Sequence, residues 1–439
     1  METKKELQSV KDKILGGILG LCVGDALGVP VEFINRELLS LNPVTEMRGY
    51  GTHNTPPGTW SDDTSMTLCL MDSLINGLNF KDIMDKFVSW LQDGEYTPYG
   101  KAFGVGQTVL KALIKYENGI DPLKCGGTLE RDNGNGSLMR ILPLLFYLRS
   151  RYLHDIPDCD EAISIIHNVS ALTHAHIKSQ TACVIYLSVA SELAFNYNGD
   201  TENCVINGML RARAFYHCIR CTRSSKDVYD YFRSFRCFDF KFKDYPQSEI
   251  KSTGYVVDTL DAALWCLLNS NSYESCVLKA VNLGGDTDTI AAVAGGLAGL
   301  AYGKEAIPIK WLELIPRKDY IEDLCIAFYD SLSIITNEQR SGKIRAVEFL
   351  LKYGLTKEEA YNTVGYNEIE NNSNYMGAYA PELPLTEFID DLDEYNRILC
   401  ERYEKCCESY KKYGAGEEME KEILLIYKDA YDKIWKLVN

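Results

Sequence analysis

Apolar residues recur at helical spacing along much of the chain, and no stretch alternates for long between apolar and polar positions. Because alternation with a period of two marks a half-buried strand, the pattern predicts an all-α protein. Residues 14–28 are rich in glycine and alanine, which lets a neighbouring backbone approach closely. Residues 291–302 are almost wholly Ala, Gly, Leu and Val, so we expect this helix at the centre of a tight helical packing. The pattern predicts further helices at residues 67–77, 80–91, 109–116, 141–148, 162–172, 179–195 and 260–268.

Glycine and proline mark the segments between these helices. The first helix is expected to end before Pro30. Residues 35–58 contain several prolines and glycines and are predicted to form an irregular loop, as are residues 94–106. Residues 203–240 carry several arginines without a clear period, and we expect them to be irregular as well.

The composition narrows the class of partner. The chain has 439 residues, of which 46% are hydrophobic, so one large core or a core with an appendage is expected. The formal net charge of −16 argues against a nucleic acid or an anionic membrane as the main partner. The 15 cysteines are odd in number and spread along the chain, a pattern typical of reduced thiols in a cytoplasmic protein. The N-terminal apolar run is expected to be too short to span a bilayer, and we expect no targeting segment and a monomer.

Two short acidic stretches, residues 58–66 and 284–289, carry the strongest chemical signal. Each places two carboxylates and neighbouring hydroxyls immediately before a predicted helix. One interpretation is helix capping, because Ser, Thr and Asp are preferred N-cap residues and acids in a first turn interact favourably with the helix dipole. The other is a metal site, because carboxylates and hydroxyls are ligands that magnesium and manganese prefer. One cap needs one side chain, so the excess of acids favours metal, and four carboxylates suit two ions better than one.

Other polar residues each allow two interpretations. Residues 133–140 form a glycine-rich loop before a predicted helix, which is either a plain connection or a cradle of N–H groups for a phosphate. His174 and His176, at the junction of two helices, are either satisfied core histidines or polar contacts for a ligand. Tyr255, at the start of another helix, is either a core residue or a stacking platform for a ring. Glu32, taken alone, is typical of a solvated loop acid.

Taken together, these features are similar to those of the ADP-ribosylglycohydrolase family. The matching motifs follow the family's order and rough spacing, and they are residues 24–28 with Glu32, 59–66, 133–140, Thr173-His174, Gly254-Tyr255 and 284–289. Within the family, the chain most resembles the bacterial dinitrogenase-reductase-activating glycohydrolase type. The resemblance implies a compact orthogonal bundle of helices with a dinuclear magnesium or manganese centre. It also implies an enzyme that cleaves ADP-ribose from a modified protein or a small ADP-ribose conjugate.

The resemblance assigns roles to residues position by position. It implies that the metal ligands are Ser61, Asp62, Asp63, Asp286, Asp288 and Thr289. Asp62 and Asp63 would thereby belong to the catalytic centre, and Glu32 would lie beside the metals as a gating or catalytic acid. The implied substrate contacts are Asn135, Gly136, Ser137 and Met139 around the distal ribose and phosphates, His174 at a ribose and Tyr255 against the adenine.

One departure from the family branch concerns Gly104. The branch carries Phe-Asp-Ile-Gly where this chain has Phe103-Gly104-Val105-Gly106, so an acid implicated in the family's mechanism is replaced. The change bears on the arginine-linked specificity or on the identity of the general acid more than on the fold. We expect a hydrolase that removes ADP-ribose, with arginine as the favoured linkage. The alternatives are a non-catalytic ADP-ribose-binding or structural protein and a hydrolase of another nucleotide-like compound.

The resemblance ends before the C-terminal part of the chain. We expect a catalytic domain over residues 1–340 and an acidic, tyrosine-rich helical extension over residues 341–439. Within the extension, residues 386–413 and 417–438 are predicted to form amphipathic helices. Its charge is more acidic than basic, which does not suit a nucleic-acid arm. The extension either restricts which modified target enters or is a solvated helical pair without a role in the chemistry.

Overall fold

The computed structural model describes residues 2–152, 156–157, 159–197, 199–222, 234–239, 241–334, 337–352 and 361. Contacts between Cα atoms divide the chain into two units, Met1–Tyr216 with Asp227–Ser373 and His217–Lys226 with Asn374–Asn439. Within the described residues, the first unit consists of helices and turns, and its β-type pairing is limited to two isolated bridges. The prediction of an all-α protein is confirmed for this part of the chain.

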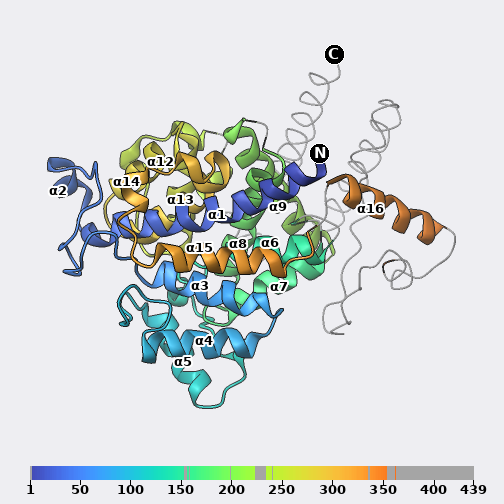
Figure 1. Ribbon diagram of the computed structural model, residues 1–439, viewed down its shortest axis with the longest axis horizontal. Coiled ribbons are helices and arrows are strands. Elements are labelled where there is room, and N and C mark those ends of the chain that lie inside the picture. Colours follow the sequence, from blue (N-terminus) through green and yellow to red (C-terminus); the bar gives the residue numbers. More distant parts are fainter. Residues whose placement is uncertain are drawn as a thin grey trace. The chain divides into compact units, whose positions relative to one another are not determined.

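Two helices form the centre of the first unit (Figure 1). Helix α1 covers Glu2–Gly28 and α13 covers Thr287–Tyr302, and the two pack along each other. Their backbones are in contact, because a Cβ atom added to Gly20 would lie only 2.5 Å from the carbonyl oxygen of Gly295. No side chain fits in such a space, so glycine is required there. The close packing predicted from the small residues of both helices is confirmed.

The apolar stretch at the N-terminus differs from the expectation in its length. Val10–Val31 is long and apolar enough to cross a membrane, whereas the sequence pattern predicted a run that is too short. Of the apolar window in this stretch, 94% is buried inside the fold, and the core helix of a folded domain has the same signature. The helix ends at Gly28, and the turn Val29–Val31 follows with Pro30 at its centre, as predicted.

The other predicted helices are present, with bounds that differ by a few residues. They are α3 (Asp62–Ile75), α4 (Phe80–Asp93), α5 (Gln107–Glu117), α6 (Pro143–Arg151), α7 (Asp160–Ala171), α8 (Ile177–Phe195) and α11 (Val256–Leu268). Helices α3, α11 and α13 begin earlier than predicted. The first turn of each of these helices contains polar residues, so the periodic apolar pattern begins only after it. The helix start predicted from that pattern therefore falls several residues after the true start.

The prediction of an irregular segment at residues 203–240 is wrong for its first part. Helix α9 covers Thr201–Thr222. Its residues Val205, Met209 and Ala212 are buried and recur at helical spacing. The polar and basic residues between them obscure this apolar face in the sequence. Packing of the face against neighbouring helices stabilises the helix.

The structure adds helices that the pattern did not predict. They are α2 (Arg36–Leu41), α12 (Tyr273–Val281), α14 (Ile309–Leu312), α15 (Lys318–Ser331) and α16 (Asn337–Lys352). Helix α2 lies in the segment predicted as a loop, and that prediction is wrong there. Short 3-10 turns occur at Pro122–Lys124, Glu130–Asp132, Arg236–Phe238, Phe242–Asp244, Gln247–Glu249 and Lys304–Ala306. The helices predicted at residues 386–413 and 417–438 lie outside the described residues, and the division between residues 340 and 341 stays a prediction.

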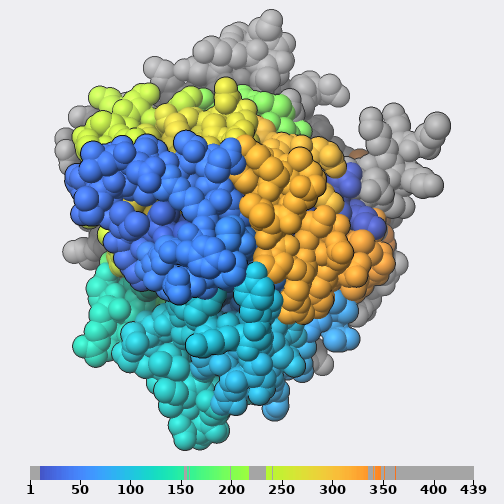
Figure 2. All heavy atoms as spheres, turned by 60° about the vertical axis from the view of Figure 1, so that its left-hand side comes forward, coloured from blue at the N-terminus to red at the C-terminus, as the bar shows by residue number. Residues whose placement is uncertain are grey.

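The loop before α3 is anchored by the segment that follows α14. Gly58 has a φ of +84°, and a Cβ atom added to it would lie 1.9 Å from the carbonyl oxygen of Leu314. Figure 2 shows the surface of this region, where the blue N-terminal residues border the orange residues that follow position 300. The first acidic stretch therefore begins from a fixed backbone position.

Replacing Gly20 with alanine is expected to destabilise the fold by about 1 to 3 kcal/mol, because the added methyl group would press on the Gly295 carbonyl. Unfolding in guanidinium chloride measures the change. Gly342 in α16 is the matched control, since nothing lies within 4 Å of a Cβ atom added there. Alanine at this control position should stabilise the helix by about 0.5 to 1 kcal/mol. Equal effects of the two substitutions would contradict a tight contact between α1 and α13.

Asp261 in α11 is a buried acid outside the two acidic stretches. Its carboxylate accepts hydrogen bonds from the N–H groups of Arg236 and Cys237, at 2.9 and 3.1 Å. Burial raises the pKa of Asp261 to about 7, although the two N–H donors oppose the shift. The folded protein therefore binds a proton at this carboxylate more tightly than the unfolded chain does.

The raised pKa makes the stability depend on pH with a defined sign. The stabilisation from the protonated Asp261 is complete below its ordinary pKa of 3.8 and is lost as the pH rises through about 7. The Asp261→Asn variant cannot ionise, so between about pH 5 and about pH 8 its free energy of unfolding should fall less than that of the wild type. Urea unfolding of both proteins at the two pH values is the measurement. Parallel falls in the two proteins would contradict the raised pKa.

Candidate active site

The first acidic stretch forms the start of α3. Ser61 is the N-cap residue: its Oγ atom accepts a hydrogen bond from the N–H of Asp63 at 3.3 Å and donates one to the Asp63 carboxylate at 2.9 Å. Asp62 and Asp63 occupy the first turn and are buried. The side chain that caps the helix within this stretch is therefore a hydroxyl, and capping does not account for the two carboxylates.

Asp25 is a site residue that the sequence pattern did not reveal. It lies in α1 and is fully buried. Its carboxylate accepts hydrogen bonds from the N–H of Ser61 at 3.0 Å and from the N–H and hydroxyl of Thr64 at 3.1 and 2.6 Å. It thereby satisfies unpaired N–H donors at the start of α3 from a neighbouring helix. An acid inside an apolar helix is costly to bury without such partners, and this was the available signal.

The second acidic stretch forms the start of α13. Asp286 is at the N-cap position without a side-chain capping bond, and its carboxylate instead accepts a hydrogen bond from the Asn135 amide at 2.6 Å. Asp288 follows in the first turn and is buried. The hydroxyl of Thr289 lies 3.4 Å from the carboxylate of Asp63, 226 positions earlier in the chain. The two stretches therefore meet, as the metal interpretation requires.

The carboxylates form two groups that share one residue. In the first group, Asp25, Asp63 and Asp288 each place an oxygen atom within 4.8 Å of the others. In the second, Glu32, Asp286 and Asp288 do the same. We refer to the members of the two groups together as the acidic cluster. Three acids around one point can hold a divalent cation, and Mg²⁺ and Mn²⁺ prefer such oxygen ligands.

The acidic cluster is electrostatically unfavourable by itself. Burial and the neighbouring acids raise the pKa of Asp63 and of Asp288 well above the ordinary value. Burial also raises the pKa of Asp25 and of Asp286 to about 6. The buried Oδ1 atom of Asp63 has no hydrogen-bond partner among the described residues. A bound cation would supply that partner and offset the repulsion, so these residues fit a divalent metal ion.

Three of the predicted ligands lie beside the two groups of acids. Ser61 and Thr289 place their hydroxyls against the Asp63 carboxylate. Asp62 faces Gly104, because a Cβ atom added to this glycine would lie 2.5 Å from Oδ1 of Asp62. Gly104 has a φ of +80°, so the loop passes over Asp62 with its bare backbone at the position where the related branch has an acid. The assignment of these three residues as ligands stays a prediction.

The glycine-rich loop is tied to both the second acidic stretch and α11. The side-chain amide of Asn135 donates to the Thr259 hydroxyl at 2.9 Å in addition to its bond to Asp286. The N–H of Asn135 donates to the carbonyl of Gly254 at 3.1 Å, just before Tyr255. The loop, the adjoining acid and the start of α11 therefore hold one another in place.

A buried arginine, Arg140, supports the same loop. No role was assigned to it from the sequence. Its guanidinium contacts the carbonyl of Gly136 and donates to the Thr173 hydroxyl at 2.8 Å. Oγ1 of Thr173 lies 2.8 Å from Nδ1 of His174. Burial lowers the pKa of His174 to about 3, so the imidazole is neutral. A Cβ atom added to Gly136 would lie 2.9 Å from this ring, so the loop and the histidine are close neighbours. The contact of His174 with a ribose stays a prediction.

Other residues singled out for substrate contact have side chains that are buried or hydrogen-bonded within the fold, and their role in substrate binding stays a prediction. Ser137 is buried and its hydroxyl accepts a hydrogen bond from Ser170 at 3.0 Å. Met139 is also buried. His176 caps α8, since its Nδ1 atom accepts a hydrogen bond from the N–H of Lys178 at 3.2 Å. Contact of Ser137 or Met139 with a substrate would therefore come through the backbone.

Tyr255 lies half-buried at the start of α11, so it is neither a fully buried core residue nor a fully exposed platform. Its hydroxyl donates to the Glu130 carboxylate at 3.2 Å, and Gly134 of the glycine-rich loop pairs with it in an isolated bridge. The ammonium group of Lys178 lies 5.7 Å from the ring centroid. The ring is thus held by polar neighbours at the edge of the loop, and its contact with adenine stays a prediction.

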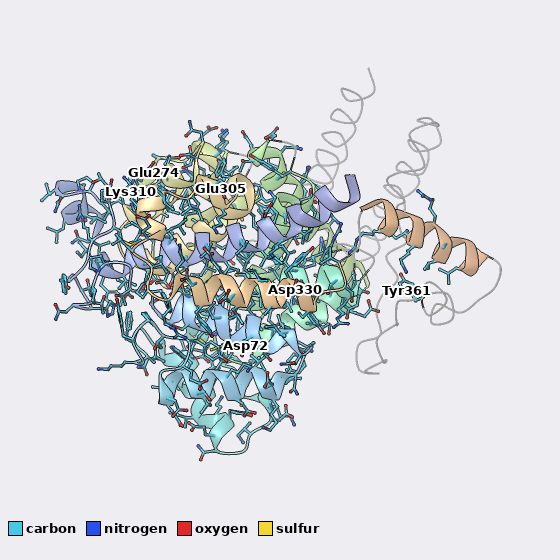
Figure 3. The ribbon with its side chains drawn as sticks, viewed as in Figure 1. Asp72, Glu274, Glu305, Lys310, Asp330 and Tyr361 are labelled. Carbon is cyan, nitrogen blue, oxygen red and sulfur yellow. The ribbon has the colours of Figure 1, made fainter. Side chains whose placement is uncertain are left out.

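Asp25→Asn is expected to weaken the binding of a divalent cation by about 10- to 100-fold, because the amide removes a negative charge from the acidic cluster. The NH2 group of the new side chain would also face backbone N–H donors from which the carboxylate accepts hydrogen bonds. Calorimetric titration with Mn²⁺ measures the affinity. Asp72→Asn is the control. Asp72, labelled in Figure 3, lies on the same helix as Asp63, and its carboxylate pairs with Lys86 at 2.8 Å. Unchanged affinity in the Asp25 variant would contradict its place in the cluster.

Comparison with known proteins agrees with the geometry. A profile of the ADP-ribosylglycohydrolase family matches residues 6–338. The ADP-ribosylarginine hydrolase Tri1 of Serratia proteamaculans is 32% identical over 316 residues, which cover 71% of this chain and 78% of that protein. The ADP-ribosyl-[dinitrogen reductase] glycohydrolase of Rhodospirillum rubrum is 30% identical over 71% of this chain and 92% of its own length.

A solved structure gives the same result for the fold. The chain of an ADP-ribosylglycohydrolase-related protein complex is similar with a TM-score of 0.57 and 31% sequence identity. The match covers 74% of this chain and 100% of that chain. The family match spans the helices that carry the acidic cluster, the glycine-rich loop and Tyr255. The chain therefore belongs to the ADP-ribosylglycohydrolase family.

Proposed function

We propose that this protein hydrolyses the bond between ADP-ribose and a modified arginine side chain, using two divalent cations, Mg²⁺ or Mn²⁺. The observation that carries the proposal is the position of Asp288, which belongs to both groups of three carboxylates. A carboxylate shared between two such groups would contribute to the binding of both cations. Asp25 and Asp63 would complete one site and Asp286 the other, with Glu32 beside the second site as the catalytic acid.

The chemistry needs a held ribose, an attacking water and a place for protons. The cations, when bound, orient the ribose hydroxyls and the water and stabilise developing negative charge. Glu32 is 7% exposed at the edge of the cluster and is the candidate to take the proton of the water as its oxygen bonds to the anomeric carbon. The bond from that carbon to the guanidine nitrogen breaks, and Glu32 passes the proton it took from the water to that nitrogen, so that water is divided between the ribose and the released arginine.

The rest of ADP-ribose would lie along the glycine-rich loop. The N–H groups of that loop and the adjoining turn suit a diphosphate, because local dipoles bind an anion even on a chain with a net charge of −16. His174 lies against Gly136 and would meet a ribose as a neutral ring. Tyr255, at the other edge of the loop, would lie against the adenine.

Separate observations support the arginine linkage and the cytoplasmic compartment. Two related proteins carry names that specify arginine or dinitrogen reductase as the modified group. Gly104 replaces an acid of that branch, so the linkage is a proposal and not a property of the family. The cysteines with described side chains are free and buried, which suits the reducing cytoplasm. We propose an ADP-ribosylated protein or small conjugate as the partner.

Release of ADP-ribose from arginine-ADP-ribosylated protein is the decisive measurement. With added Mg²⁺ or Mn²⁺ we expect release, and with a chelator we expect none, because the acidic cluster alone cannot orient the ribose and the water. Binding of ADP-ribose in a parallel titration serves as the control for an intact pocket. Binding without release from any linkage would favour the non-catalytic alternative.

Asp288→Asn should abolish turnover while the protein stays folded, since Asp288 is shared by both groups of acids. Initial rates on the arginine-linked substrate and circular dichroism spectra measure the two effects. Asp72→Asn, whose carboxylate pairs with Lys86 at 2.8 Å, should keep the wild-type rate. A wild-type rate in the Asp288 variant would exclude the two-metal proposal.

A further inference from the structure

Phe33 is exposed beside the acidic cluster in a conformation that is unusual for its type. It directly follows Glu32, has 70% of its surface exposed and adopts a φ of 65°. Bulky residues rarely occupy this left-handed region, and such outliers often lie at functional sites. The N–H of Phe33 donates a 2.7 Å hydrogen bond to the carbonyl of Gly285, next to Asp286. The second acidic stretch therefore fixes the backbone that carries this exposed ring.

Two further aromatic rings continue from Phe33. The ring centroid of His53 lies 6.3 Å from that of Phe33 and 5.1 Å from that of Phe103. Nε2 of His53 contacts the carboxylate of Glu32, so the three rings lie next to an acid of the cluster. We refer to Phe33, His53 and Phe103 as the aromatic row. The three rings come from turns and loops that are far apart in the sequence, since Phe33 follows the turn Val29–Val31 and Phe103 precedes α5. Figure 1 shows the helices between which these segments run.

The other end of the aromatic row borders Asp62. Phe103 is followed by Gly104, and a Cβ atom added to that glycine would lie 2.5 Å from Oδ1 of Asp62. Gly104 is exposed and has no side chain to cover this carboxylate. The row therefore runs along the edge of the acid-lined site, from Glu32 to the loop over Asp62. Its rings are accessible, because Phe33 is exposed and the other two are half-buried.

Aromatic rings next to carboxylates suit a planar cation. The face of an aromatic ring is electron-rich, and a guanidinium is planar, weakly hydrated and prone to stack on such faces. The acids of the cluster add negative potential on the same side. A neutral leaving group, such as the hydroxyl of a serine, would gain from neither feature. The surroundings of the row therefore discriminate between leaving groups of different charge.

We infer that Phe33 and Phe103, with His53 between them, bind the guanidinium group of the modified arginine. The inference rests on the proposed function, since it places the leaving group beside the ribose that the proposed cations would orient. Phe33 is then a specificity-determining residue. It adds affinity for an arginine conjugate and none for free ADP-ribose, which lacks the guanidinium.

The test compares the binding of ADP-ribosylarginine with that of ADP-ribose by calorimetry, in the presence of a chelator so that no conjugate is hydrolysed. The wild type should bind ADP-ribosylarginine more tightly. Phe33→Leu should weaken the binding of this conjugate by about 3- to 30-fold, the range of a cation–π contact, and leave the affinity for ADP-ribose unchanged. With Mg²⁺ or Mn²⁺ added, kcat/KM for an arginine-linked peptide should fall by a similar factor.

Tyr50→Leu is the matched control. Tyr50 is also an aromatic residue of positive φ, 56°, with 69% of its surface exposed, and it makes no ring contact with the aromatic row. Its substitution should change neither affinity. Equal loss for both ligands in the Phe33 variant, or no loss for either, would overturn the inference.

The same experiment separates this inference from the proposed function. A wild-type protein that prefers ADP-ribosylarginine but does not cleave it with metal present would refute the proposed reaction and support the guanidinium site. A wild-type protein that cleaves the arginine linkage while Phe33→Leu retains full preference would support the reaction and refute the site.

Discussion

The contact between the backbones of α1 and α13 is the constraint on which the site depends. Glycines at helical spacing let the two helices approach until no side chain fits between them. At the end of this contact, a Cβ atom added to Gly28 would lie 2.3 Å from the Cα atom of Asp288. Asp25, one turn earlier on α1, thereby reaches the same group of carboxylates as Asp288. A wider separation of the two helices would move the acids of the cluster apart.

The N-termini of three helices surround the site, and the residues at each make different hydrogen bonds. Ser61 caps α3 with its hydroxyl, and Asp25 accepts further bonds from the same helix start. Asp286 stands at the start of α13 without capping it and accepts from Asn135. Tyr255 begins α11 and pairs with the glycine-rich loop. The carboxylates are consequently held by hydrogen bonds before any cation binds, which limits the reorganisation that binding requires.

The leaving-group side differs in character from the ADP-ribose side. The glycine-rich loop presents backbone N–H groups and a neutral histidine, which suit phosphates and ribose. The aromatic row presents Phe33, His53 and Phe103 beside Glu32, which suit a planar cation. One substrate can satisfy both only if it is anionic at one end and cationic at the other. An ADP-ribosylated arginine has this distribution of charge, which agrees with the linkage that we propose.

The sequence by itself determined the fold class, the central place of the two glycine-rich helices and the pairing of two acidic stretches, because small-residue spacing and excess carboxylates are local signals. It did not reveal α9, whose apolar face is interrupted by polar residues and folds against neighbours. It also left Asp25, Arg140 and His53 without a role. Each is a single residue whose meaning depends on partners distant in the chain, such as Thr64, Thr173 and Glu32. Only the tertiary structure decides such partners, since burial and hydrogen bonding between distant segments have no local period.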